Sequence, residues 1–184
     1  AALPVDPYVL GFWLGDASSD YGGIPYGRKK DGLVDEMISR GYSGKVRDIP
    51  AKNSSYITSS RLTEDLRLAG VLGNKHIPVE YLLASERQRR DLLAGLVDSD
   101  GFVLKAEGGA DVGIDMTNER LSRDIYTLLM TLGCKVRWSE GVASYTLGGE
   151  RHVTGTRYRM NWTPLENPFK VRGQNWRSPG GQRS

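Results

Sequence analysis

Two aspartates, Asp16 and Asp100, lie near the ends of two copies of one nine-residue pattern. Residues 93–101 read LAGLVDSDG and residues 9–17 read VLGFWLGDA. In both copies an apolar run carries small residues four positions apart, which places them on one face of a helix. Two such helices can pack closer than the usual separation of about 8–10 Å, and this would bring the two carboxylates together. Because neighbouring carboxylates repel each other unless a cation neutralises them, the pattern predicts a Mg²⁺ site suited to cleaving phosphodiester bonds.

The doubling of the pattern indicates two half-domains that pack through matching helices. A buried amphipathic helix with a capping aspartate would explain either copy alone, but small residues at matched positions in both copies favour the paired interpretation. We therefore expect one half-domain over residues 1–85, a second over 86–177, and a flexible tail over 178–184.

The remaining elements follow from hydrophobic spacing and from turn residues. The first motif helix is expected at 6–16, and the second begins near residue 86. Further helical segments are expected at 35–40, 61–72 and 118–132, and a short helix or turn at 78–84. Strands are expected at 54–58, 112–116, 135–139 and 156–163.

Three stretches of the chain resemble the LAGLIDADG homing endonucleases, specifically the two-repeat endonuclease domains of inteins. Residues 6–16 (DPYVLGFWLGD) resemble the first motif copy of that family. Residues 73–82 (GNKHIPVEYL) resemble its lysine-bearing segment, and QRRDL at 88–92 precedes the second motif. The resemblance runs in order from about residue 3 to residue 135.

The resemblance implies an α+β fold of two αββαββα halves around a pseudo-twofold axis, with a saddle of β-strands over DNA. It implies that Asp16 and Asp100 bind metal, with help from the backbone carbonyls of Gly15 and Ser99. By the same resemblance, Lys75 contacts the scissile phosphate or positions the attacking water. A basic residue of the second half should match it, and Lys170 is the candidate.

Two positions depart from the family pattern. Ala17 replaces the glycine that usually follows the first aspartate, and Leu14 stands where the second copy has Asp98. Neither change removes a proposed metal ligand, so we expect an active site.

Two later segments are candidates for contact with DNA. Alternation places Arg157, Arg159 and Asn161 on one face of a strand, and Lys135 and Arg137 on one face of another. A two-stranded ribbon fits the major groove, where arginine reads guanine and asparagine reads adenine. A half-exposed sheet with charged outer positions is the alternative explanation.

Charge and cysteine content agree with this interpretation. The net charge is +3, and residues 151–184 carry seven basic residues against one acidic residue, which suits a polyanionic partner. The single cysteine, Cys134, rules out an internal disulfide and is typical of an intracellular protein. With no apolar segment long enough to span a membrane, we expect a cytoplasmic protein that acts on DNA.

The residues and the resemblance together predict a monomeric, site-specific DNA endonuclease that uses Mg²⁺, with Mn²⁺ expected to substitute. The resemblance implies that it cuts both strands and leaves 3′ overhangs. Since the chain begins at Ala1 and ends without a His-Asn pair, we expect no splicing activity. The alternative function is a non-catalytic DNA- or RNA-binding protein on the same scaffold, such as a transcription regulator or an intron maturase.

Overall fold

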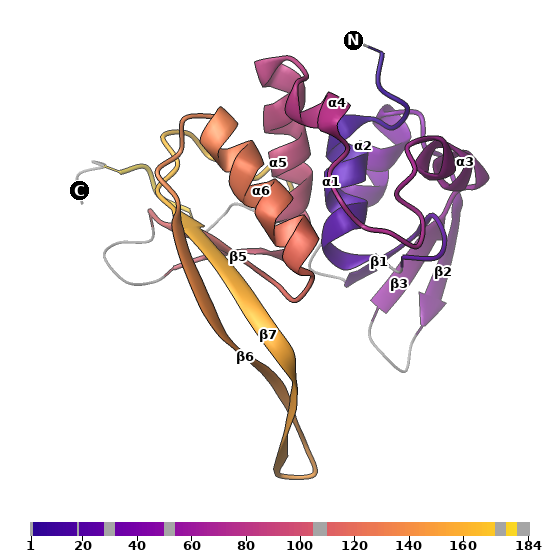
Figure 1. The fold of residues 1–184 in the computed structure, drawn as a ribbon. Coiled ribbons are helices and arrows are strands. Elements are labelled where there is room, and N and C mark those ends of the chain that lie inside the picture. Colours follow the sequence, from indigo (N-terminus) through magenta and orange to yellow (C-terminus); the bar gives the residue numbers. More distant parts are fainter. Residues whose placement is uncertain are drawn as a thin grey trace. The chain divides into compact units, whose positions relative to one another are not determined.

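The computed structural model describes residues 2–17, 19–27, 32–49, 54–104, 110–171 and 176–179. The chain divides into two compact units. Unit 1 comprises Ala1–Asp100 with Pro168–Gln174, and unit 2 comprises Gly101–Asn167 with Asn175–Ser184. Each unit combines helices with an antiparallel sheet (Figure 1), which confirms the predicted α+β class.

Unit 1 contains a three-stranded sheet and most of the helices. The strand order is β1-β3-β2. The elements, in chain order, are α1 (Pro7–Asp16), β1 (Gly23–Gly27), α2 (Leu33–Ser39), β2 (Lys45–Ile49), β3 (Ser54–Thr58), α3 (Ser60–Leu68), α4 (Val79–Leu82) and α5 (Glu86–Asp100).

The start of α1 follows directly from its sequence. The side chain of Asp6 accepts hydrogen bonds from the backbone N–H groups of Tyr8 and Val9, at 3.0 and 3.3 Å, and thereby caps the helix. Pro7 occupies the first turn, where its missing N–H costs nothing. Every residue from Pro7 to Leu14 is buried, so α1 lies inside unit 1 and has no exposed polar face over this stretch.

In the described residues, unit 2 contains a four-stranded sheet of order β4-β5-β7-β6 and one helix. Asn118 caps the helix by accepting a hydrogen bond from the N–H of Leu121, as its position in the sequence predicts. Buried Ile125 and Leu128 of the helix and buried Met160 and Trp162 of β7 contribute to the apolar core. The elements are β4 (Gly101–Val103), β5 (Val112–Met116), α6 (Glu119–Thr131), β6 (Arg137–Leu147) and β7 (Glu150–Trp162).

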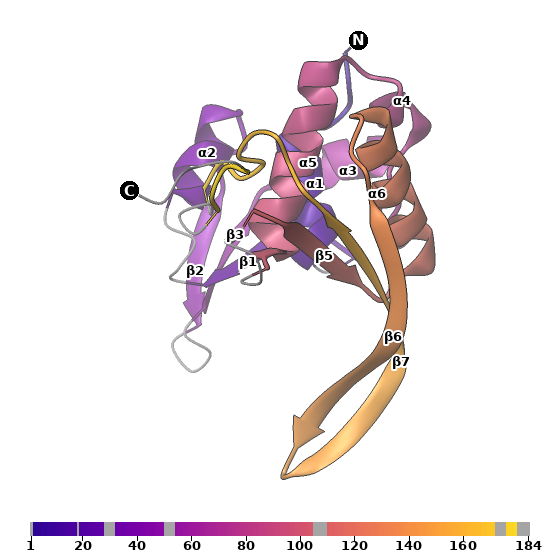
Figure 2. The ribbon, with the colours of Figure 1, turned by 90° about the vertical axis from the view of Figure 1, so that its left-hand side faces the viewer.

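The β6–β7 hairpin is longer than the sequence predicts. Strand β5 pairs only with residues 158–162 of β7, whereas β6 and β7 remain paired as far as Leu147 and Glu150. Figure 2 shows the hairpin continuing past β5 as a two-stranded ribbon. Gly148 and Gly149, with φ of 60° and 87°, close it in the left-handed conformation that a two-residue hairpin turn requires.

The structure alters or leaves open three other expectations. The helix expected at 61–72 already ends at Leu68, two residues before Gly70 with φ of 70°. Of the expected tail, residues 180–184 lie outside the described residues. The boundary expected after residue 85 stays a prediction about sequence halves, since α5 belongs to unit 1. Over the described ranges, no helix combines the length and the apolar character needed to cross a bilayer.

Candidate active site

The two motif helices, α1 and α5, touch through their backbones. A Cβ atom placed on Gly95 would lie 2.0 Å from the carbonyl oxygen of Tyr8, and one on Gly11 would lie 2.1 Å from that of Leu92. These distances leave no room for any side chain, and they confirm the close approach predicted from the spacing of small residues. At the carboxyl ends of the two helices, the close contact is made by a side chain instead of the backbone. A Cβ on Gly15 would lie 2.6 Å from the Cβ of Ser99.

This packing brings the carboxyl ends of α1 and α5 together, and with them Asp16 and Asp100. Both aspartates are exposed. A Cβ on Gly15, the residue before Asp16, would lie 3.6 Å from the Cβ of Asp100. The negative charges of both carboxylates also favour the protonated form of one lysine, Lys75. The carboxyl end of a helix carries partial negative charge, so two helix ends and two carboxylates make a site that favours a cation.

The ligand set at this site is small. In the part of the chain that the structure describes, no group of three or more His, Cys, Asp and Glu side chains is placed to hold a metal. The carboxylates of Asp16 and Asp100, with the carbonyls of Gly15 and Ser99, are oxygen donors of the kind that Mg²⁺ takes. Mg²⁺ usually keeps several waters and completes its shell with phosphate oxygens.

Lys75 lies against the end of α1. Its Nζ donates hydrogen bonds to the carbonyl oxygens of Trp13, Leu14 and Ala17 at 3.0, 3.0 and 2.6 Å. It also lies 4.9 Å from the centre of the Trp13 ring. Burial lowers the pKa of Lys75 to about 8, although the charges of Asp16 and Asp100 act in the opposite direction. Lys75 therefore caps α1 and brings a positive charge beside the two aspartates.

Asp98 is a residue whose role the sequence did not reveal. Its side chain is fully buried in α5 and accepts hydrogen bonds from the Tyr8 hydroxyl at 2.9 Å and from the backbone N–H groups of Lys170 and Val171 at 3.1 and 2.9 Å. Burial, together with the Asp98 carboxylate, raises the pKa of Tyr8. An aspartate inside the apolar run LAGLVDSD was the available signal, but nothing in the sequence identified partners so far away along the chain.

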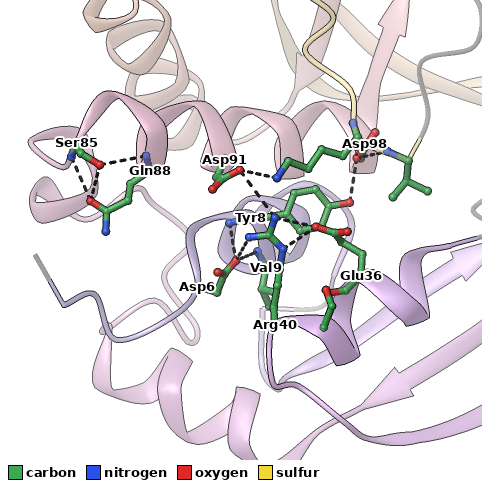
Figure 3. A network of polar contacts seen from close by, with 12 residues as sticks. Asp6, Tyr8, Val9, Glu36, Arg40, Ser85, Gln88, Asp91 and Asp98 are labelled. Carbon is green, nitrogen blue, oxygen red and sulfur yellow. Dashed lines mark hydrogen bonds and ion pairs between the residues drawn. The ribbon is translucent and has the colours of Figure 1, made fainter.

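The ammonium group of Lys170 is directed toward Asp91 and away from the two motif aspartates, although the backbone N–H of Lys170 contacts Asp98. Its Nζ is 2.6 Å from a carboxylate oxygen of Asp91, which precedes Asp100 by nine residues, or about 13.5 Å along α5. Asp91 also lies 3.8 Å from Arg40. Figure 3 shows this charged network, in which Arg40 reaches Asp6 and Glu36, beside the cluster at Asp98.

The basic residues expected to meet DNA share one face of the unit 2 sheet. Arg137 pairs with Asn161 across β6 and β7, and Arg159, paired with Ser139, lies two register positions further along. Lys135 precedes β6 and is exposed. The opposite face packs on α6 through Trp138, whose ring contacts Tyr126. Two aspartates interrupt the basic face, because Asp111 pairs with Arg137 and Asp115 pairs with Arg157 and Arg159.

A second basic surface, on the unit 1 sheet, was not predicted. Lys45 and Arg47 on β2 lie opposite Thr58 and Tyr56 on β3, and both basic residues are exposed. The alternation around Val46 was the available signal. This signal is weak because the strand has only five residues and its apolar residue, Val46, is half-exposed, so the two faces differ little in polarity.

Comparison with known proteins finds a family model that matches part of the chain. Residues 76–163 match the family model described as homing endonuclease. The replicative DNA helicase DnaB of Mycobacterium intracellulare is 45% identical over 167 residues, which cover 91% of this chain and 25% of that protein. The chain thus spans about a quarter of the length of this curated relative.

Solved structures of the homing endonuclease I-DmoI share the fold. Its complex with DNA and Ca matches with a TM-score of 0.56 at 14% identity, covering 94% of this chain and 95% of that one. A structure from a study of its mesophilic variants matches with a TM-score of 0.54 at 14% identity, covering 87% and 89%. The chain thus matches the homing endonuclease family model over residues 76–163 and shares the fold of I-DmoI.

Proposed function

We propose that this chain is a site-specific DNA endonuclease that hydrolyses one phosphodiester bond in each strand, with divalent metal ions, and leaves staggered 3′ overhangs. The observation that carries the proposal is the convergence of Asp16 and Asp100 at the ends of two helices in backbone contact. A structural role needs no such pair, because exposed carboxylates at touching helix ends repel each other when no cation is bound.

Asp16 and Asp100 would hold the metal, with the carbonyls of Gly15 and Ser99 as further oxygen donors. A bound divalent metal supplies charge neutralisation at the phosphate and a more acidic water. I-DmoI has been crystallised with DNA and Mn, Mg or Ca, which supports a divalent ion here, with Mg²⁺ preferred and Mn²⁺ as a substitute.

The basic residues divide into two roles. Lys75 holds the end of α1 in place and contributes positive charge beside the scissile phosphate, through the contacts that fix it to Trp13, Leu14 and Ala17. Lys170 stays a prediction for the matching role in the second half, and its ion pair with Asp91 gives that prediction no support. The sheet residues Lys135, Arg137, Arg157, Arg159 and Asn161 would contact the duplex, together with Lys45 and Arg47 of unit 1.

We also infer that the chain is the endonuclease domain of an intein and acts as a monomer. A helicase that resembles this chain over a quarter of its own length has the organisation expected of a host protein that carries an inserted intein. The pairing of both motif helices within one chain makes a second copy unnecessary for the site.

The test is cleavage of a randomised duplex library in Mg²⁺, followed by sequencing of the cut ends. The wild type should enrich one long site, and Asp16→Asn, Asp100→Asn and EDTA should each abolish the enrichment. Asp35→Asn, an exposed aspartate of α2, is the matched control and should cut normally. Full cutting by both motif variants would refute the proposed site. A library that is bound and enriched but never cut would instead establish a non-catalytic nucleic-acid-binding protein.

A further inference from the structure

The basic face of unit 2 has a carboxylate at its centre. Asp115 on β5 lies directly opposite Arg159 on β7. Its two oxygens accept hydrogen bonds from Nε and from one terminal nitrogen of Arg159, both at 2.6 Å. Arg157, two residues earlier on β7, has its Nε 3.8 Å from the same carboxylate. An acidic residue lowers the attraction of this face for phosphate, so its position needs an explanation.

Arg159 is held from a second side by an aromatic ring. Its guanidinium carbon lies 5.1 Å from the ring centre of Phe102, which comes from β4. The ring has room because Gly113 lies opposite Phe102, and a Cβ on Gly113 would lie 2.6 Å from that ring. A planar guanidinium that is fixed by a two-point carboxylate contact and by an aromatic ring has little rotational freedom left.

The donors of Arg159 are divided by this arrangement. A guanidinium has five N–H donors, and Asp115 uses those of one edge, formed by Nε and one terminal nitrogen. The end of the fork, formed by the two terminal nitrogens, still carries N–H groups in the plane that Asp115 sets. Two coplanar donors are what the O6 and N7 acceptors of guanine require in the major groove.

We propose that Asp115 is a positioning residue for sequence recognition, which orients Arg159 so that the end of its guanidinium reads one guanine of the target site. Asp115 acts through Arg159 and does not itself touch the base. The carboxylate also partly neutralises Arg159 and Arg157, so it weakens binding to DNA of any other sequence while it improves discrimination at one position. The inference rests on the proposed function, because it presupposes a DNA target.

The test compares base preferences, position by position, in the randomised-library selection. Asp115→Asn keeps the shape of the side chain but leaves it one acceptor oxygen, so the two-point contact is lost. We expect it to lose on the order of tenfold preference at one base pair. Arg159→Lys should lose preference at that same base pair, and the double variant should lose no more than either single variant. Binding of Asp115→Asn to a random-sequence duplex should be tighter and more salt-dependent.

Glu166→Gln is the matched control, because Glu166 is an exposed acidic residue of the same unit. It should increase the affinity for random DNA in the same way and leave every base preference unchanged. If Asp115→Asn keeps the preference that Arg159→Lys loses, the positioning role is refuted while the endonuclease stands. If Asp115→Asn melts at a lower temperature and loses preference along the whole site, its role is structural and the inference also fails. A wild type that enriches no sequence would refute the proposed function itself.

Discussion

The two motif helices resemble each other in sequence, but they are held in place by different means. Helix α1 is buried from Pro7 to Leu14, and its carboxyl end is capped by the ammonium group of Lys75. Helix α5 carries a buried carboxylate, Asp98, where α1 has Leu14, and it runs straight into β4 at Gly101. The repetition of the motif in the sequence therefore does not extend to the contacts that support each helix. Asp16 and Asp100 thus lie at the ends of two helices that have different surroundings.

The largest expected effect comes from the feature that both helices share. Gly95→Ala and Gly11→Ala should each lower the free energy of unfolding by about 3 kcal/mol or more. The new methyl group would overlap backbone atoms of the other helix, which cannot move aside as a flexible side chain can. Gly15→Ala should cost less, since it meets the side chain of Ser99. Urea denaturation measures all three variants.

A swap sharpens this prediction. Gly15→Ala combined with Ser99→Gly moves the side chain from one helix to the other, and we expect it to recover most of the stability that Gly15→Ala loses. Equal losses for Gly15→Ala and Gly95→Ala, with no recovery in the swap, would show that the two helices do not pack as described.

The next effect separates the two helices. Asp98→Leu removes the acceptor of the Tyr8 hydroxyl and of two backbone N–H groups, so it should lower the free energy of unfolding by about 3 kcal/mol. Asp98→Asn keeps one oxygen and should cost less. Adding Tyr8→Phe to Asp98→Leu removes one of the unpaired donors and should restore part of the loss, which thermal and urea denaturation can measure. An Asp98→Leu protein as stable as the wild type would contradict the assignment.

The smallest effect concerns the cap on α1. The pKa of Lys75 is about 8 in the folded protein and about 10.4 in an unfolded chain. Between these values the unfolded state binds more protons, so the folded state gains stability as the pH rises from about 8 to 10. Lys75→Met should lack this gain, which gives a difference of about 2 kcal/mol between the two proteins in EDTA. The measurement is urea denaturation from pH 7 to pH 10, and parallel pH curves for the two proteins would count against a buried Lys75.

Local signals in the sequence predicted the elements and the shared part of the site. Asp6 and Asn118 cap helices through side-chain contacts to residues no more than three positions away. The positions of these two helix starts could therefore be predicted from the sequence alone. The close approach of α1 and α5 also followed, because Gly11 and Gly95 recur at matching positions.

The contacts that differ between the two helices depend on distant packing, and they escaped prediction for that reason. Asp98 finds its partners 72 and 73 residues later in the chain, and the ion pair of Lys170 with Asp91 exists only once that segment has returned to α5. The length of the β6–β7 hairpin was not predicted, because the parts of its strands near the turn do not alternate between buried apolar and exposed polar residues. Val142, Tyr145, Leu147 and Val153 are all exposed there.

The return of residues 168–171 to unit 1 has a consequence for the order in which the protein is made. A ribosome releases the chain from its amino end, so both motif helices emerge well before Lys170 and Val171. Until those residues appear, the buried carboxylate of Asp98 lacks two of its donors, and unit 1 lacks its second segment. The helices that carry the motif aspartates thus reach their final hydrogen bonding only after the whole β6–β7 hairpin has been synthesised.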